Sequence, residues 1–95
     1  VILPISEKFR EYAEEVYTQL LTEDIRGYVD HRDEKIGKKI RDAEVLKIPY
    51  MLVIGEKEVA ENKVSIRKHG EGDKGSMSVS GFVGLFKEQV QQALQ

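Results

Sequence analysis

The 95-residue sequence contains no cysteine and no tryptophan and has only two prolines. The absence of cysteine excludes a disulfide framework, a zinc ribbon and a cysteine nucleophile. A small domain without cross-links is typical of a reducing compartment, so we expect a cytoplasmic protein. The longest purely apolar run, Met51–Ile54, is far shorter than the roughly 20 residues of a membrane span, and no signal sequence opens the chain. We therefore expect neither membrane insertion nor secretion.

The chain also lacks a strong excess of either charge. Its 15 Lys and Arg residues stand against 17 Asp and Glu residues, which gives a net charge of -2, and 40% of the residues are hydrophobic. This apolar fraction is sufficient for a folded domain, and the length supports one hydrophobic core but not two. The sequence begins at Val1, without an initiator Met, in a segment typical of a strand. We expect residues 1–95 to form a single domain, a fragment of a longer protein.

The hydrophobic period changes repeatedly between that of a strand and that of a helix, which predicts the order β-α-β-α-β-β-β-α. Strands are expected at residues 1–3, 26–31, 50–54, 63–68 and around 77, with a polar turn at 56–62 and a loop at 70–75. Helices are expected after Ser6, over 34–46 behind an Asp33 cap, and from Val79 onward. Two crossover connections join the first three strands, so the fold class is α/β, with a mainly parallel sheet.

In such sheets ligands bind outside the carboxyl ends of the parallel strands. Here those ends are residues 4–6, 31–34 and 55–58. The position of these segments alone nominates two charged clusters, one around residues 31–34 and one around residues 55–58, as parts of a functional site.

One of these clusters has the residue types of an enzyme site, since Asp30, His31, Asp33 and Glu34 offer ligands for a divalent metal or a general acid and base. An acid before a helix is, however, more often a cap, and neighbouring strand residues point to opposite faces. The Gly70–Gly75 segment has the G-x-G-x-x-G spacing but lies between two expected antiparallel strands, where it predicts a hairpin loop. No G-x-S-x-G nucleophile motif is present.

The isoelectric point of about 5.7 disfavours a duplex-DNA-binding surface, which is usually basic. The basic residues are nevertheless clustered, in one group that includes Lys38, Lys39 and Arg41 and in a second that includes Lys63 and Arg67. Such runs are usually solvated surface. Recognition of single-stranded bases needs less net charge, because unpaired bases are read by stacking and by hydrogen bonds to their Watson–Crick edges. Composition alone leaves both interpretations open.

The segments 32–41 (RDEKIGKKIR) and 47–58 (KIPYMLVIGEKE), followed by 63–67 (KVSIR) and 75–77 (GSM), closely resemble the C-terminal anticodon-binding domain of threonyl-tRNA synthetases. The resemblance spans nearly the whole chain. It implies a mixed five-stranded sheet with three helices, attached in a longer enzyme to a catalytic core that this chain lacks.

The resemblance also implies a function: recognition of the anticodon loop of threonine tRNA, in which the second and third anticodon bases are G and U. It implies no catalysis and no cofactor or metal in this domain, whereas the parent threonine-tRNA ligase is expected to use ATP, Mg²⁺ and a zinc ion in its catalytic domain. The expected partners are the tRNA anticodon loop and that catalytic domain, with no DNA and no membrane.

Carried over residue by residue, the family pattern assigns base recognition to Glu58 and Arg67. A carboxylate accepts the two donors of a guanine Watson–Crick edge, and arginine donates to base acceptors or stacks on the ring. Asp33 stands where the family commonly has asparagine, so it accepts hydrogen bonds but has lost the amide donors. We expect phosphate contacts from residues in two neighbouring segments: Arg32, Lys35 and Lys47.

Two alternatives remain at this stage. One is a copy of the same domain repurposed for protein assembly or regulation. The other is a small metal-dependent α/β enzyme that uses the Asp30, His31, Asp33 and Glu34 cluster. The first would show a defined oligomer without RNA binding, and the second would show metal-dependent turnover.

Overall fold

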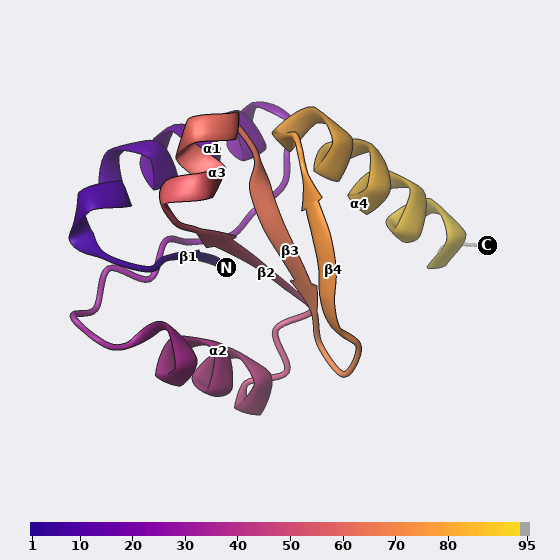
Figure 1. Cartoon of the computed structure of the whole chain (residues 1–95). Coiled ribbons are helices and arrows are strands. Elements are labelled where there is room, and N and C mark those ends of the chain that lie inside the picture. The colour runs from indigo at the N-terminus through magenta and orange to yellow at the C-terminus, as the bar shows by residue number, and fades with distance from the viewer. Residues whose placement is uncertain (94–95) are drawn as a thin grey trace.

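The computed structural model describes the backbone of residues 1–93 and the side chains of residues 1–90. Figure 1 follows the chain through nine elements. In chain order they are β1 (Ile2–Pro4), the short 3₁₀ helix η1 (Glu7–Phe9), α1 (Arg10–Thr22), α2 (Ile36–Val45), β2 (Tyr50–Ile54), α3 (Glu56–Glu61), β3 (Val64–Lys68), β4 (Gly72–Met77) and α4 (Val79–Ala93). The predicted mixed α/β class is confirmed.

The sheet has four strands in the order β1-β2-β3-β4, not the five that we expected. Only β1 and β2 are parallel, while β2–β3 and β3–β4 are antiparallel, so the sheet is mixed but not mainly parallel. The strand expected at 26–31 is reduced to one parallel bridge between Val29 and Ile2. It ends there because the Asp30 carboxylate accepts the backbone N–H of Arg32, which turns the chain away from the sheet edge.

Three local predictions were also wrong. The segment 56–62, expected as a turn, contains the helix α3. At its start the backbone N–H of the N-cap residue Gly55 donates to the Glu58 side chain. Most of the expected 70–75 loop belongs to β4, because the turn after β3 is completed within residues 68–72, with Gly70 and Gly72 at positive φ. Asp33 does not cap α2, whose N-cap is Lys35, and no side chain bonds that helix end.

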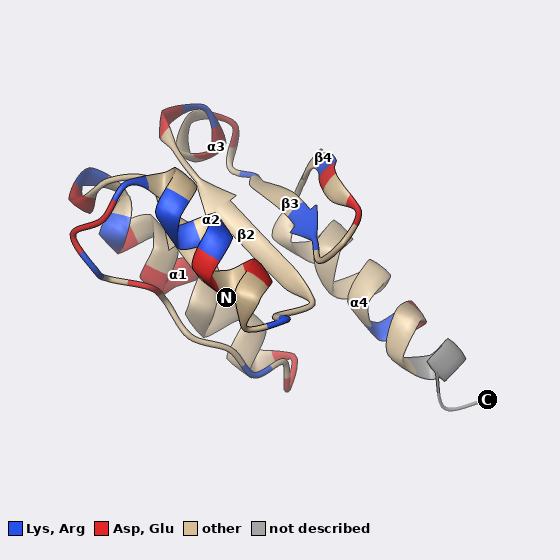
Figure 2. Cartoon of the chain, turned by 90° about the horizontal axis from the view of Figure 1, so that it is seen from below, with Lys and Arg blue, Asp and Glu red and all other residues tan. Residues whose placement is uncertain are grey.

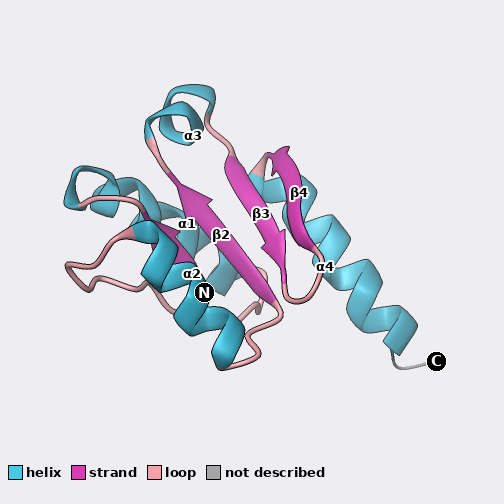
Figure 3. Cartoon of the chain, turned by 60° about the horizontal axis from the view of Figure 1, so that its bottom comes forward, coloured by secondary structure: helices cyan, strands magenta, loops and turns pink. Residues whose placement is uncertain are grey.

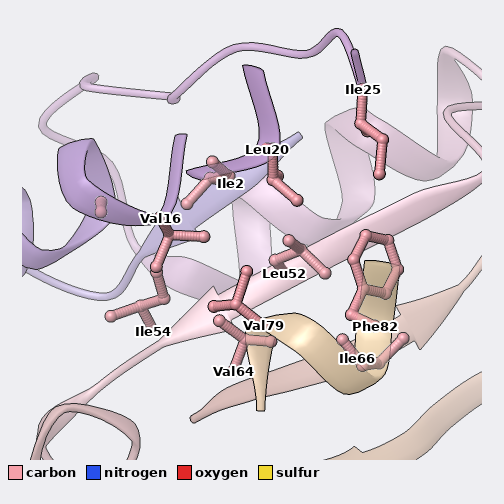
Figure 4. Packing of buried hydrophobic residues seen from close by; sticks show 11 residues of the cluster. Ile2, Val16, Leu20, Ile25, Leu52, Ile54, Val64, Ile66, Val79 and Phe82 are labelled. Carbon is pink, nitrogen blue, oxygen red and sulfur yellow. The ribbon is translucent and has the colours of Figure 1, made fainter. Parts of the chain in front are cut away.

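The larger core lies between the sheet and the helices α1 and α4, on the upper face of the sheet in Figure 1. Figure 4 shows its apolar side chains, which come from both helices and from three strands. The period-2 pattern of β2 and β3 places Leu52, Ile54, Val64 and Ile66 on this face, each at most 2% exposed. The β2 strand is buried on both faces, as its continuous apolar sequence predicted.

A smaller core lies on the opposite face, where α2 packs Ala43 over Leu3 and Met51. Figure 3 views the sheet from this side: α2 lies over the β1–β2 part, whereas no helix lies in front of β3 and β4. Leu46, just beyond the end of α2, is 68% exposed and does not contribute to this core. Among the described helices, none covers β3 and β4 on this face of the sheet.

Candidate functional site

The carboxyl ends of the first strands meet at one edge of the sheet, as the topology predicted. The backbone N–H of Ile5 donates to Ile54 across the ends of β1 and β2, at 2.9 Å. Beside this contact lies a polar cavity of about 380 Å³ between the end of β1 and the loop that leads to α2. It is lined by Pro4, Ile5, Ser6, Glu7, Arg10, His31, Arg32, Asp33, Glu34 and Lys39. The strand end at 4–6 and the nominated cluster at 31–34 therefore lie side by side, whereas no residue of the second nominated cluster, 55–58, lines this cavity.

Lys39 is buried at the base of this region, with 4% of its surface exposed. Its ammonium donates to the carbonyl oxygens of Pro4 and Asp30, both at 3.1 Å. The sequence groups Lys39 with Lys38 and Arg41 in a basic cluster expected at the surface, and for Lys39 this expectation was wrong. Its position three residues after Ile36 and four before Ala43 puts it on the inward face of α2, which is the signal that would have identified it.

Arg32 does not point freely into solvent but joins two carboxylates. Its Nε and Nη2 donate to the two oxygens of Asp30 at 2.9 and 2.8 Å, and its Nη1 donates to Asp42 at 2.9 Å. These hydrogen bonds hold the pKa of the Asp30 carboxyl below its usual value, and that of Asp42 likewise, while they raise the pKa of Arg32. The cationic charge of Arg32 is largely balanced by these two partners.

The candidate enzyme cluster is similarly engaged in contacts within the domain. His31 Nε2 lies 2.6 Å from the Glu14 carboxylate, and its Nδ1 accepts from Arg10 Nε at 3.3 Å. Both oxygens of Asp30 are bonded by Arg32. No group of three or more metal-ligating side chains was found among the residues that the structure describes. Two of the four cluster residues are therefore committed to structural hydrogen bonds.

Glu58 stands where the sequence placed it, at the carboxyl end of β2 and in the first turn of α3. Its Oε1 accepts the backbone N–H of Gly55 at 2.7 Å, and its Oε2 has no hydrogen bond within the described part of the chain. Gly55 permits this closure for steric reasons: a Cβ on it would lie 2.8 Å from Ile5 Cδ1 and 3.1 Å from Glu58 Oε1. The Glu58 carboxylate is thus fixed at the carboxyl end of β2, with acceptor capacity remaining.

Arg67 projects from β3 on the open face of the sheet, because it alternates with Val64 and Ile66, which face the larger core. Its Nε is buried and has no hydrogen-bond partner among the described residues. The acid opposite it on β4, Asp73, accepts the backbone N–H of Gly75 instead. Arg67 is therefore a half-buried cation whose hydrogen-bonding capacity is not used within the described domain.

Glu58 and Arg67 do not form one contact. Arg67 pairs with Met51 near the start of β2, whereas Glu58 follows the end of that strand, which separates their backbones by at least about 10 Å. Two of the expected phosphate-binding residues lie at the ends of α2, Lys35 as its N-cap and Lys47 just after its end. Figure 2, seen from the α2 side, shows basic positions along this helix. We refer to the five expected positions Asp33, Lys35, Lys47, Glu58 and Arg67 together as the strip.

The position of Lys47 is set by the helix ending. Lys47 has a positive φ of 59°, and the N–H of Ile48 donates to Ala43 while that of Lys47 donates to Glu44, a Schellman ending. Asp33 and Lys35 lie in exposed positions of the loop before α2. No ion pair of Lys35 or Lys47 occurs among the described residues. These lysines are available to a ligand, in contrast to Arg32.

Comparisons with known proteins agree in sequence and in fold. A family model described as an anticodon binding domain matches residues 1–89. The threonine–tRNA ligase of Cytophaga hutchinsonii is 62% identical over 93 residues, which cover 98% of this chain and 14% of that protein. That of Bacteroides fragilis is 56% identical over 94 residues, or 99% of this chain and 15% of that protein. The chain thus spans about a seventh of the length of these relatives.

Solved structures give the same picture. The RNA binding domain of threonyl-tRNA synthetase from Cryptosporidium parvum superposes with a TM-score of 0.85 at 32% identity, covering 92% of this chain and 22% of that one. Histidyl-tRNA synthetase from Nostoc sp. PCC 7120 superposes with a TM-score of 0.84, but at 17% identity it shares the fold alone.

None of the helices in the described part of the chain has the length and apolar character that a membrane span requires.

Proposed function

The chain belongs to the anticodon-binding domain family of threonyl-tRNA synthetases, and from this premise we propose that it binds the anticodon loop of threonine tRNA without making or breaking a covalent bond. Its role is to select the tRNA for a longer threonine–tRNA ligase, of which it is one domain. The remaining part of that ligase supplies the chemistry, with ATP, Mg²⁺ and a zinc ion in the catalytic domain. The proposed location is the cytoplasm.

The observation that carries this proposal is that Arg67 Nε is buried and has no hydrogen-bond partner among the described residues. A buried guanidinium nitrogen without a partner is costly, and native proteins rarely leave such a group unsatisfied without a reason. No helix of the described residues covers β3 and β4 on this face of the sheet (Figure 3). A nucleobase supplies what this site lacks, because its ring nitrogens and carbonyl oxygens accept from the guanidinium and its face stacks on it.

Glu58 provides the complementary chemistry at the other end of the strip. Its hydrogen bond from Gly55 fixes the carboxylate, and the remaining acceptor sites suit the N1–H and N2–H₂ donors of guanine. We assign to Glu58 the recognition of an anticodon guanine. Asp33, in the loop across the cavity, is assigned a second acceptor role toward a base donor.

Phosphate contacts are assigned to Lys35 and Lys47, which are exposed at the two ends of α2. The ten-residue helix between them is about 15 Å long, so the two lysines are far enough apart to contact different phosphates of one loop. Arg32 was an equal candidate on sequence grounds. Its ion pairs with Asp30 and Asp42 favour a different role, the ordering of the loop that carries Asp33.

The test is a low-salt binding titration of the 95-residue chain with an RNA stem-loop that carries a threonine anticodon. A second stem-loop, in which the middle anticodon G is replaced by A, is titrated beside it. We expect the G-containing loop to bind more tightly by about tenfold, and Glu58→Gln or Arg67→Ala to remove most of this preference, since one base contact is worth about 1 to 3 kcal/mol.

The matched control is Lys87→Met, which removes an exposed cation of α4 that pairs with Glu23 far from the strip. It is expected to leave the preference unchanged. Equal binding of the two stem-loops would refute base recognition and leave phosphate attraction alone. Absence of binding, together with a defined oligomer in solution, would instead favour the assembly role.

A further inference from the structure

Lys39 joins two chain segments that both line the polar cavity. Its ammonium donates to the carbonyl of Pro4, at the end of β1, and to the carbonyl of Asp30, at the start of the loop that carries Asp33. These hydrogen bonds cross 35 and 9 residues of sequence, so they are tertiary contacts and not part of the α2 ladder. Lys39 therefore fastens the loop to the sheet edge.

The burial of this lysine needs an explanation beyond stability. Removing an ammonium from water carries a penalty, and apolar residues of similar volume often stabilise a core as well as a buried charge does. Around Lys39 the apolar residues Ile36, Ile40 and Ala43 already pack α2 against the sheet. What an apolar side chain cannot supply at this position is a hydrogen-bond donor to the two carbonyl groups.

The loop that Lys39 holds has few other attachments to the sheet. Val29 makes the single bridge to Ile2, and the Asp30 N–H donates to Ile2 at 2.9 Å, but residues 31–35 form no strand or helix. The Arg32 ion pairs connect the loop to Asp42 of α2 and not to β1. Among the residues that the structure describes, Lys39 is therefore the one whose side chain links the loop directly to the carboxyl end of β1.

We propose that Lys39 is a positioning residue for RNA recognition: it fixes the 30–34 loop against β1 so that Asp33 and Lys35 meet the same RNA loop as Glu58. The inference rests on the proposed function, because it assigns Lys39 a role in that same site. Lys39 itself does not contact the RNA in this proposal. It acts through the position of the 30–34 loop, while Arg67, on β3, is positioned by the sheet and is independent of it.

This independence makes the proposal testable by a thermodynamic cycle in the same stem-loop titration. We expect Lys39→Met to weaken binding by about tenfold, the scale of one lost contact. In a Lys35→Ala, Asp33→Ala background the same change should weaken binding less than twofold, because the contacts that Lys39 positions are already absent. In an Arg67→Ala background it should keep its full effect. A general loss of folded structure would instead affect all backgrounds alike.

Amide hydrogen exchange measures the loop itself and needs no RNA. In Lys39→Met the amides of Asp30 and Arg32, which donate to the Ile2 carbonyl and to the Asp30 carboxylate, should exchange at least about fivefold faster, while those of β2 keep their protection. If β2 also loses protection, Lys39→Arg replaces that variant, since it keeps a cationic donor; it should retain the protection of the Asp30 and Arg32 amides and the binding of the original chain. The Lys87→Met chain is the control for loss of one lysine charge.

Three results would overturn the proposal: binding by Lys39→Met within twofold of the original chain, an equal loss in the Lys35→Ala, Asp33→Ala background, or unchanged exchange of the Asp30 and Arg32 amides. The exchange result separates this inference from the proposed function. If the original chain binds no stem-loop but the loop loses protection in Lys39→Met, the proposed function fails while the mechanical role of Lys39 stands.

Discussion

Asp30→Asn tests the ion-pair cluster that orders the loop before α2. The substitution keeps the size of the side chain but removes its charge and replaces one acceptor oxygen by an NH₂ group that faces Arg32. In the original chain the Asp30 carboxylate, 9% exposed, accepts two hydrogen bonds from the Arg32 side chain and one from its backbone N–H. We expect the substitution to destabilise the fold.

The magnitude follows from these contacts. A hydrogen bond to a charged group contributes about 1.5 to 3 kcal/mol, and asparagine retains one acceptor oxygen, so the expected loss in the free energy of unfolding is about 2 kcal/mol. Arg32 itself is half-exposed and recovers water when its partner is lost, which keeps the loss from being larger. For a domain of this size, 2 kcal/mol lowers the melting temperature by about 8 to 16 °C.

The pH dependence has a defined sign. Hydrogen bonds from Arg32 hold the pKa of Asp30 in the folded chain below its usual value of 3.8. The stabilisation is therefore complete above that usual value and is lost as the pH falls through the lower folded pKa. In urea unfolding, the difference between the original chain and Asp30→Asn should be constant from about pH 7 to about pH 5 and should shrink below about pH 4.

Asp24→Asn is the matched control, since Asp24 is exposed with φ 59°, a backbone conformation that asparagine adopts readily. Its effect should stay within about 0.5 kcal/mol at every pH. The reasoning would be refuted by an Asp30→Asn penalty as small as that of the control. A penalty that persists undiminished at acid pH would refute the assignment of the stabilisation to the ionised carboxylate.

The remaining predictions concern packing and RNA affinity. In Gly55→Ala the added Cβ would crowd Ile5 after β1 and the Glu58 carboxylate, so the free energy of unfolding measured in urea should fall by about 1 kcal/mol. In Gly37→Ala, within α2, the added Cβ meets nothing within 4 Å, so the free energy of unfolding should rise by about 0.5 to 1 kcal/mol. Equal effects of the two substitutions would contradict the steric argument. Asp33→Asn keeps one acceptor oxygen, removes a negative charge and adds two donors, so it should tighten stem-loop binding about fivefold, and unchanged binding would argue against a contact of Asp33 with the RNA. If Lys35 and Lys47 each contact one phosphate, the logarithm of the stem-loop association constant plotted against the logarithm of the salt concentration should have a slope of about −1.4. Lys47→Ala should reduce the magnitude of this slope by about 0.7. An unchanged slope would show that Lys47 does not contact a phosphate.

The parts of the fold that the sequence predicted are those with a strong local pattern. The apolar period of α1 and the continuous apolar run of β2 identified both elements, and the meeting of the strand ends followed from the crossover order. The helix at 56–61 was missed because it is short and polar, and what defines its start is a bond between Glu58 and the amide of Gly55, which periodicity does not report.

The errors at the candidate site have a common physical origin in tertiary contacts. Arg32 and Lys39 are equally basic in sequence, but one is neutralised by Asp30 and Asp42 and the other is buried against carbonyl groups. Residues 26–31 have strand-like composition, yet only Val29 bridges β1, since the turn at Asp30 ends the pairing. Glu58, Arg67 and Asp33 as base-reading residues stay predictions that await the titration.

The open face beside β3 and β4 also bears on how the domain avoids self-association. A sheet that is left uncovered for a ligand ends in an edge strand, and unpaired edges are templates for strand pairing between molecules. In β4 the ladder is interrupted by a register shift, and Gly72 and Gly75 take positive φ values that bend the strand out of a flat edge. Lys74 and Glu71 add charges at the same place. The irregularity of β4 therefore makes this sheet edge a poor template for strand pairing with a second molecule.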